Sequence, residues 1–180
     1  MNDFKTFELI KSDFKRYGKK VTVLNIVKEI ILGNHAFKFT FWLRLCGHRG
    51  VLFPISRLMY SYYSKKYGLQ IPYTTKIGYG LYLGHGLNIV VNNSASIGNN
   101  CNISHFCTIG SNFDKAAKIG DNVYLGPAVC IVENVIIGNN VTIGAGSVVV
   151  KDIEENATVG GVPSKVLSFN NPGRFITNRC

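Results

Sequence analysis

A six-residue repeat constrains this chain more than any other feature of its sequence. From residue 77 to residue 149 an aliphatic residue returns every six positions, with two extra residues after Ile89 and four after Ile109. The twelve positions are Ile77, Leu83, Ile89, Ile97, Ile103, Ile109, Ile119, Leu125, Ile131, Ile137, Ile143 and Val149. Glycine follows directly at eight of the twelve. Six residues suit a short strand and a tight corner, where Gly and Asn accept a positive φ.

Three such steps close a triangular coil, so the twelve positions predict about four coils of a parallel β-solenoid. Equivalent aliphatic residues would then stack about 4.8 Å apart in successive coils. A β-sandwich would instead show period-two alternation with turns every 8 to 12 residues or so, and the repeat lacks that pattern. We therefore expect a mainly β protein.

The first part of the chain has helical rather than six-residue spacing. Apolar residues predict helices over about 4–14, 23–31, 36–46 and 55–66, with Gly18 and Gly33 at helix ends. We divide the chain into a helical region (1–70), the solenoid (71–169) and a C-terminal tail (170–180). The net charge of +10 is uneven: residues 1–70 hold thirteen Lys and Arg against four acids, and the rest hold seven against six.

The composition excludes several classes of protein. Hydrophobic residues make up 46% of the chain, so it can bury a core. No run of about 18 apolar residues suggests a membrane span, and the N-terminus lacks the basic and then apolar pattern of a secretory signal. Five cysteines without a C-x-x-C pair indicate neither a disulfide framework nor a zinc ribbon. We expect a cytoplasmic protein with reduced cysteines, in which Cys107 is a packing residue rather than a nucleophile.

Three motifs carry a resemblance to a known family. They are KIGYGLYLGHG (76–86), CTIG (107–110) before a loop insertion, and TIGAGSVVVKDI continuing to VGGVPSKV and ending at Val166. The run from Thr74 to Phe169 resembles the left-handed β-helix of the hexapeptide-repeat acyltransferases, above all serine acetyltransferases and polysaccharide-biosynthesis O-acetyltransferases. The resemblance implies a left-handed coil, transfer of acetyl from acetyl-CoA to a hydroxyl, and a homotrimer with sites between neighbouring solenoids.

Histidine is the natural general base for this reaction, since a hydroxyl must lose its proton as it attacks a thioester. By the resemblance, His85 stands at the position of the family's catalytic histidine. His105 follows Ile103 as His85 follows Leu83, so we expect the two to stack at one corner and His105 to orient the substrate or polarise the oxyanion. We expect His35 and His48 to be surface residues of the helical region.

The resemblance also implies a path for the acetyl-CoA arm, because in the family the pantetheine arm runs along such a corner. Pro127 and Ala145 occupy the position of His105 in later coils, so we expect His85, His105, Pro127 and Ala145 to lie in one line. The neighbouring glycines Gly126, Gly144 and Gly161 complete the predicted cofactor-binding set. The segment 160–165 resembles the family's terminal motif, whose basic residue lies near the CoA phosphates, so Lys165 is our candidate for that contact.

Three departures from the serine enzymes concern the acceptor. By the resemblance, Gln70 stands where those enzymes carry an Asp that orients the catalytic histidine, and Asn93 stands where they carry a Glu. A second histidine of their loop falls near Ala116 here. Fewer charged groups favour a neutral acceptor, so we predict a sugar hydroxyl in capsular or exopolysaccharide biosynthesis, with Gln70 and Asn93 lining its site. The sugar acceptor would be a small molecule or a lipid-linked precursor. The alternatives are serine acetylation in cysteine biosynthesis and a non-catalytic solenoid scaffold.

Other partners follow from charge and histidine content. Between Phe37 and Tyr67, aromatic residues such as Trp42 alternate with Lys38, Arg44, Arg49, Arg57, Lys65 and Lys66. This mixture could contact the inner face of an anionic membrane or could pack within the oligomer. No nucleic-acid motif accompanies the charge. We expect no metal, because the zinc site of γ-class carbonic anhydrases on a similar solenoid takes three histidines and only two fall in this one.

Overall fold

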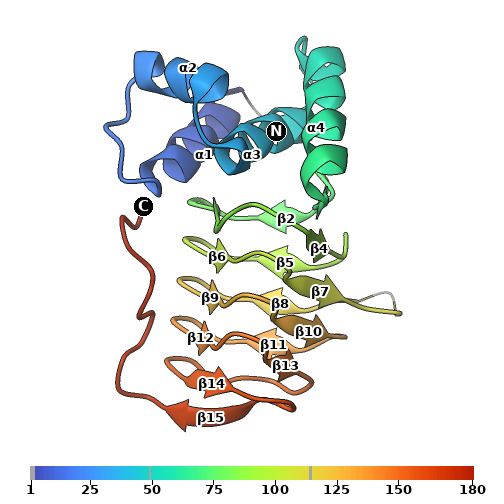
Figure 1. Cartoon of the computed structure of the whole chain (residues 1–180), viewed down its shortest axis with the longest axis vertical. Coiled ribbons are helices and arrows are strands. Elements are labelled where there is room, and N and C mark those ends of the chain that lie inside the picture. The colour runs from blue at the N-terminus through green and yellow to red at the C-terminus, as the bar shows by residue number, and fades with distance from the viewer. Residues whose placement is uncertain (1–2, 49, 114) are drawn as a thin grey trace.

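Four helices form a cap on one end of the molecule (Figure 1). The computed structural model describes residues 3–48, 50–113 and 115–180. The helices are α1 (Asp3–Lys15), α2 (Val23–Leu32), α3 (His35–His48) and α4 (Phe53–Tyr67). All four expected helices are therefore present. Gly33 ends α2 by donating its N–H to the Glu29 carbonyl, but with extended backbone, whereas Gly68 ends α4 with a left-handed φ of 65°.

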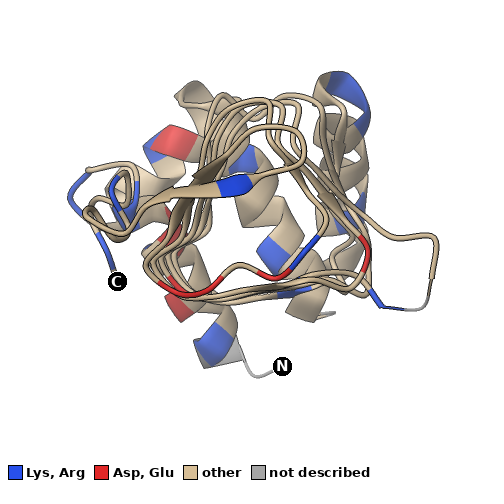
Figure 2. Cartoon of the chain, turned by 90° about the horizontal axis from the view of Figure 1, so that it is seen from below, with Lys and Arg blue, Asp and Glu red and all other residues tan. Residues whose placement is uncertain are grey.

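Below the cap, short strands wind into a parallel solenoid with a triangular cross-section (Figures 1 and 2). Sheet 1 consists of β1 (Leu69–Gln70), β4 (Ile89–Val91), β7 (Thr108–Gly110), β10 (Cys130–Val132) and β13 (Val148–Val149). Sheet 2 consists of β2 (Lys76–Ile77), β5 (Ser96–Ile97), β8 (Lys118–Ile119) and β11 (Ile136–Ile137). Sheet 3 consists of β3 (Tyr82–Leu83), β6 (Asn102–Ile103), β9 (Tyr124–Leu125), β12 (Thr142–Ile143), β14 (Thr158–Gly160) and the antiparallel β15 (Lys165–Ser168).

The predicted stacking of aliphatic residues is confirmed on two of the three sheets. Ile77 pairs with Ile97 and Ile97 with Ile119, while Leu83 pairs with Ile103 and Ile103 with Leu125. The solenoid also extends beyond the twelve expected steps. Leu69 and Gln70 add a strand above the first coil, and residues 153–160 add part of a coil below the last.

On sheet 1 the expected register is wrong in the first coil. Val91, not Ile89, pairs with Ile109, while Ile89 pairs with Leu69 of β1. Ile89 and Val91 are both buried aliphatic residues with the same strand phase, so hydrophobicity alone does not distinguish them. The two extra residues of the first coil therefore lie before β4, in the corner that carries His85.

Asparagines line the corner between sheets 2 and 3. Asn100, Asn122, Asn140 and Asn156 have φ values between 54° and 66°. Each of the first three donates its side-chain amide to the side-chain oxygen of the next, at 3.3, 3.0 and 3.0 Å. Asparagine tolerates the left-handed backbone of these corners and also bridges successive coils.

A buried ion pair joins the cap to the first coil. Asp13 of α1 accepts hydrogen bonds from Arg44 of α3 at 2.8 and 2.9 Å and from the Leu81 N–H at 2.8 Å. Arg44 also donates to the carbonyls of Ile77 and Gly78. Burial raises the pKa of Asp13 even though Arg44 opposes that shift. These hydrogen bonds fix the helical cap against the first coil of the solenoid.

The C-terminal tail runs back along the solenoid to the cap (Figure 1). The Gly173 N–H donates to the Asn140 carbonyl, and the Phe175 carbonyl accepts from the Asn102 side chain. At its end, the Cys180 N–H donates to Asn100 Oδ1 and the thiol contacts the Ser12 carbonyl. The expected tail is therefore a strap that links the last coil to α1.

The longest described helix, α4, has 15 residues, and none of the described helices is long and apolar enough to cross a membrane.

Candidate active site

The rings of His85 and His105 meet at the corner between sheets 3 and 1. Their centroids are 5.1 Å apart and their planes are nearly perpendicular, at 85°. His85 follows β3 and is exposed, whereas His105 follows β6 and is half-buried. The expected meeting of the two histidines is confirmed. An exposed imidazole beside a second ring can take up a proton from a bound hydroxyl.

The expected line through His85, His105, Pro127 and Ala145 is confirmed for the rings of the two histidines, but the backbone of His85 departs from it. The Ala128 N–H donates to the His105 carbonyl and the Gly146 N–H donates to the Pro127 carbonyl, so these corners continue one ladder. In the first coil, the Phe106 N–H donates to the carbonyl of Leu87, not of His85. The two-residue insertion moves His85 out of the backbone ladder. Both His85 and Gly86 have left-handed backbone, with φ of 62° and 51°.

His35 holds this displaced corner from the cap. Its Nε2 lies 2.9 Å from the His85 carbonyl oxygen and 3.1 Å from the Gly86 carbonyl oxygen. Because both partners are acceptors, Nε2 must carry the proton and donate. The His35 ring stacks on Tyr67 at 4.0 Å. The expectation that His35 is a plain surface residue is therefore wrong: it is half-buried and grips the backbone of the candidate base.

Gly86 has a steric reason to be glycine. A Cβ at this position would lie 2.6 Å from the Cβ of Ala36 in α3, which is closer than real Cβ atoms approach. The insertion is thus packed tightly beneath the start of α3. In the sequence, the glycine after His85 indicates a close contact at this position, but nothing indicates that the contact is with Ala36.

The ring of His105 contacts His85 on one side and Phe106 on another. Its ring lies 5.3 Å from that of Phe106, and its Nδ1 is buried without a hydrogen-bond partner among the described residues. An unpaired buried ring nitrogen costs free energy in the folded state. Such unsatisfied groups occur where a substrate or water completes the pairing.

The predicted cofactor residues follow the corner along the solenoid. Pro127 is half-buried, Ala145 and Gly161 are exposed, and each stands two residues after the buried aliphatic residue of its strand. Lys165 is exposed at the start of β15, opposite Gly160. Packing alone explains the glycine at position 126, because a Cβ there would lie 2.8 Å from the backbone nitrogen of Ala145. At Gly144 the nearest such atom is 3.4 Å away.

The two predicted substrate residues, Gln70 and Asn93, lie on different parts of the solenoid, and neither is hydrogen-bonded to His85 within one described chain. Gln70 is exposed on β1 and pairs with Val90 of β4, on the sheet that follows the histidine corner. Asn93 lies at the next corner, between sheets 1 and 2, where its side-chain oxygen accepts a hydrogen bond from Thr74. Within one chain, the part described here contains no hydrogen bond from either residue to His85. The buried Ala116 donates its N–H to Ser94.

Cys107 is buried beneath the histidine corner and is not poised as a nucleophile. Burial raises the pKa of its thiol to about 11, and the thiol donates to the Gly126 carbonyl at 3.1 Å. Only the thiolate is strongly nucleophilic. The two imidazoles therefore remain the candidate acid–base groups of this corner.

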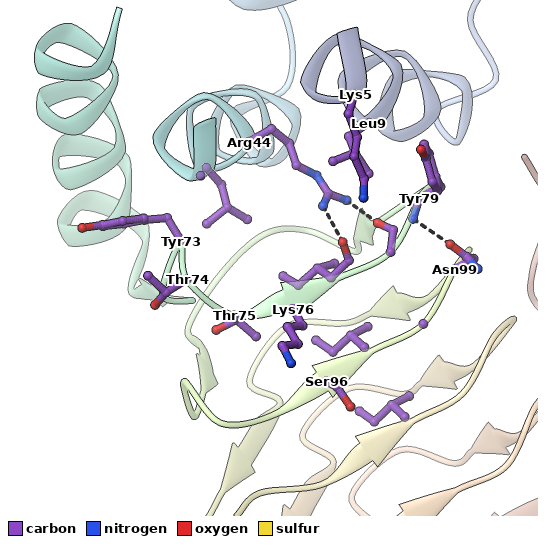
Figure 3. Close-up of a pocket in the computed structure, with 17 residues that line it drawn as sticks. Lys5, Leu9, Arg44, Tyr73, Thr74, Thr75, Lys76, Tyr79, Ser96 and Asn99 are labelled. Carbon is purple, nitrogen blue, oxygen red and sulfur yellow. Dashed lines mark hydrogen bonds between the residues drawn. The ribbon is translucent and has the colours of Figure 1, made fainter. Parts of the chain in front are cut away.

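A separate cavity of about 620 Å³ lies between the cap and sheet 2 (Figure 3). Arg44 lies above it, with hydrogen bonds to the first coil, and Tyr73 and Tyr79 stand at its sides (Figure 3). Neither His85 nor His105 lines this hollow. Within residues 3–48, 50–113 and 115–180, no cluster of three or more His, Cys, Asp or Glu could hold a metal ion.

Comparison with known proteins gives the same relationship from sequence and from structure. Residues 116–151 match the family described as bacterial transferase hexapeptide (six repeats). A galactoside O-acetyltransferase of Lactococcus lactis is 41% identical over 68 residues, which is 38% of this chain and 33% of that protein. A putative lipopolysaccharide biosynthesis O-acetyl transferase of Escherichia coli is 45% identical over 56 residues, 31% of this chain and 29% of that protein. The matched segments thus span about a third of these relatives' own length.

The structural likeness is longer. The crystal structure of Neisseria gonorrhoeae serine acetyltransferase in complex with serine superposes with a TM-score of 0.76 at 30% identity. That superposition covers 92% of this chain and 70% of the other. It includes both the helical cap and the solenoid, so the likeness is not confined to the repeat. The chain therefore belongs to the hexapeptide-repeat transferase family.

Proposed function

We propose that this protein transfers an acetyl group from acetyl-CoA to a hydroxyl, with His85 as the general base. The single observation that carries the proposal is the pair of imidazoles 5.1 Å apart at one corner of the solenoid. His85 is exposed, so a substrate hydroxyl can reach it, and its backbone is held by His35. The names of the relatives, which are acetyltransferases, support the same reaction.

In the proposed reaction a single group, the imidazole of His85, first accepts a proton and later returns it. His85 removes the proton of the acceptor hydroxyl as its oxygen attacks the thioester carbonyl and the new C–O bond forms. The resulting tetrahedral intermediate expels the CoA sulfur as the C–S bond breaks. The sulfur takes the proton back from the imidazolium, and free CoA leaves as the thiol. We assign to His105 the orientation of the acceptor or polarisation of the oxyanion.

The pantetheine arm of acetyl-CoA runs, in this proposal, along the corner past Pro127, Ala145 and Gly161. The side chains along this edge are small or cyclic and protrude little, so a thin chain can lie close to the backbone. Gly126 and Gly144 shape the same edge, and Lys165 supplies charge for the phosphates. Filling the edge with the bulky side chain of Ala145→Trp tests the path: it should raise the KM for acetyl-CoA much more than it lowers kcat.

We propose a homotrimer, because one solenoid edge forms only one wall of a groove. A neighbour would supply the other wall, and Asn93 of one chain, at a different corner from His85, could then serve the site of the next. Light scattering at micromolar concentration tests this directly. A mass of one chain, 19.9 kDa, would rule out a shared site.

For the acceptor we propose a sugar hydroxyl, as in capsular or exopolysaccharide biosynthesis. Gln70 and Asn93 are neutral, and Ala116 is buried and apolar, so the chain offers few charges for an amino acid zwitterion. Two of the relatives carry sugar-related names. The serine alternative has its own support, since the neighbour solved with serine is similar over most of this chain.

One experiment separates these possibilities. Thiol release from acetyl-CoA is measured with free L-serine, simple sugars and nucleotide sugars, for the native protein and for His85→Asn. Sugar-dependent release that the variant lacks supports the proposal. Release with serine alone assigns the serine reaction instead. Binding of acetyl-CoA without release on any acceptor counts against the proposed reaction, and absence of both identifies the solenoid as a scaffold.

A further inference from the structure

Helix α2 presents an apolar face to the outside of the molecule. Its inner side is covered: Ile26 packs in a buried cluster with Phe14 of α1 and Phe37 of α3. The residues of its outer side are all exposed: Val23, Leu24, Val27, Ile31 and Leu32. Leu32 is 84% exposed and Val23 66%. Such values are unusual for so many large apolar residues on one helix of 10 residues.

This face lies at the end of the molecule farthest from the last coil. Figure 1 shows α2 on the side of α1 and α3 that faces away from the solenoid. The turn that leads into α4 reaches the same end (Figure 1) and adds Val51, which is 98% exposed, and Leu52. We define the end face as these seven apolar residues of α2 and of the turn. The histidine corner is not part of it.

The charges around the end face all have one sign. Lys19, Lys20 and Lys28 are exposed beside α2, and Lys38 donates to the Ile31 carbonyl at the end of that helix. From residue 16 to residue 70 the chain holds ten Lys and Arg but one acid, Glu29. Glu29, a residue of α2 itself, is buried, forms an ion pair with Lys19 and accepts a hydrogen bond from the Asn34 N–H. The described part of residues 16–70 therefore offers no exposed acid that could complement a basic partner.

We propose that the end face docks on the surface of an anionic lipid bilayer. Exposed Leu, Ile and Val on one side of a helix with lysines at its edges are what an interfacial helix needs, since the apolar side enters the acyl boundary and the lysines meet lipid phosphates. A second copy of this chain fits less well, because two such faces would bring their lysines together. The proposal extends to an end of the molecule that takes no part in acetyl transfer.

This assignment keeps only Lys38 and the turn with Val51 and Leu52 from residues 37–67, the segment for which a membrane contact was expected, and adds α2. Within that segment Phe37, Phe39 and Arg44 are buried, and Trp42 packs against the core. Arg49 lies outside the described residues. The aromatic and basic mixture of α3 therefore serves the interior of the cap, and the adjacent α2 supplies the exposed face.

Vesicle flotation tests the proposal without any enzymatic reaction. The native full-length protein is mixed with phosphatidylcholine vesicles that contain either no phosphatidylglycerol or about 30 mol% of it. We expect flotation with the anionic vesicles only, weakened by raising the salt from about 0.1 to about 0.5 M. The double variants Leu24→Ser/Ile31→Ser and Lys20→Glu/Lys28→Glu should each lower the vesicle affinity about tenfold or more.

Matched controls come from the solenoid. Ile136→Ser/Val150→Ser removes two exposed apolar residues, and Lys118→Glu/Lys151→Glu reverses two exposed charges. Both should bind vesicles as the native protein does, with all variants showing unchanged thermal unfolding. The proposal fails if anionic vesicles do not float the protein, if neutral ones do so equally, or if the controls lose as much binding. It also fails if light scattering shows an assembly that only the Leu24→Ser/Ile31→Ser variant loses, which would assign the face to a second copy.

Discussion

The Nε2 of His35, at the start of α3, lies 2.9 Å from the carbonyl oxygen of His85, fifty positions later in the chain. This contact gives the helical cap a part in the candidate active site. The two-residue insertion that carries His85 has left the solenoid ladder, so the coil alone does not hold it. His35, seated on Tyr67, supplies the missing hydrogen bonds from outside.

We predict that His35 positions His85. Two variants of His35 test separately its stacking ring and its hydrogen-bond donor. His35→Phe keeps a ring on Tyr67 but removes the N–H, whereas His35→Gln keeps an N–H but removes the stacking ring. The Phe variant should lower kcat about tenfold to a hundredfold, because small displacements of a reacting group are costly. Its KM for acetyl-CoA should change by less than about threefold, since the predicted arm path lies elsewhere.

The Gln variant should recover part of that kcat. A purely structural role for His35 would give a different result: equal losses of thermal stability and of activity in both variants, with no recovery by Gln. Kinetics and thermal unfolding measured on the same samples distinguish the two.

His85→Asn should keep the fold and lower turnover by about 10² to 10⁴, the usual contribution of a general base. Asparagine suits the test because His85 has a φ of 62°, which Asn tolerates better than Ala. Near-native turnover in the Asn variant would remove His85 from the mechanism. Circular dichroism of the variant provides the check on folding.

The asparagine corner gives a prediction about stability. Asn122→Ala removes two side-chain bridges, to Asn100 and Asn140, and places alanine at a φ of 56°. We expect a loss of about 3 to 4 kcal/mol in the free energy of unfolding, from about 1 to 2 for the left-handed backbone and about 1 for each of the two hydrogen bonds. Asn122→Gly loses the bridges but not the backbone preference, so it should cost less than Ala in denaturant titrations. Equal costs would show that the φ requirement does not matter.

The cysteines predict how stability depends on pH. Burial raises the pKa of Cys101 to about 12 and that of Cys107 to about 11, from an ordinary 9.0. Above pH 9 the unfolded chain loses these protons while the folded chain retains them, so the unfolded state binds fewer protons and stability falls as pH rises toward 12. Below pH 9 this contribution is constant.

Denaturant titrations between pH 8 and pH 11 or so, for the native protein and Cys101→Ala/Cys107→Ala, measure this effect. The double variant should show a flatter profile above about pH 9. It should also retain acetyl transfer, because neither thiol takes part in the proposed chemistry. Identical pH profiles would contradict the burial of these thiols, and loss of acetyl transfer in a folded variant would contradict the histidine mechanism.

The sequence alone determined the solenoid and most of its strands. Each coil pairs with the next at a nearly constant spacing, so the period of Ile, Leu and Val records the number of steps, and Gly and Asn record the corners. His85 and His105 could be placed together because both stand two residues after stacked aliphatic residues. Local spacing carries this information, and it needs no knowledge of distant contacts.

Only the tertiary structure decided where the insertion lies, what holds His85 and which helix faces outward. Ile89 and Val91 share the phase of a strand, so the choice between them depends on pairing with Leu69 and Ile109 across coils. The hydrogen bonds of His35 join the start of α3 to the corner of His85, and no repeat in the sequence relates these two segments. The exposed face of α2 depends on α1 and α3 covering only its other side, because an apolar residue on an amphipathic helix is buried or exposed according to what packs against it.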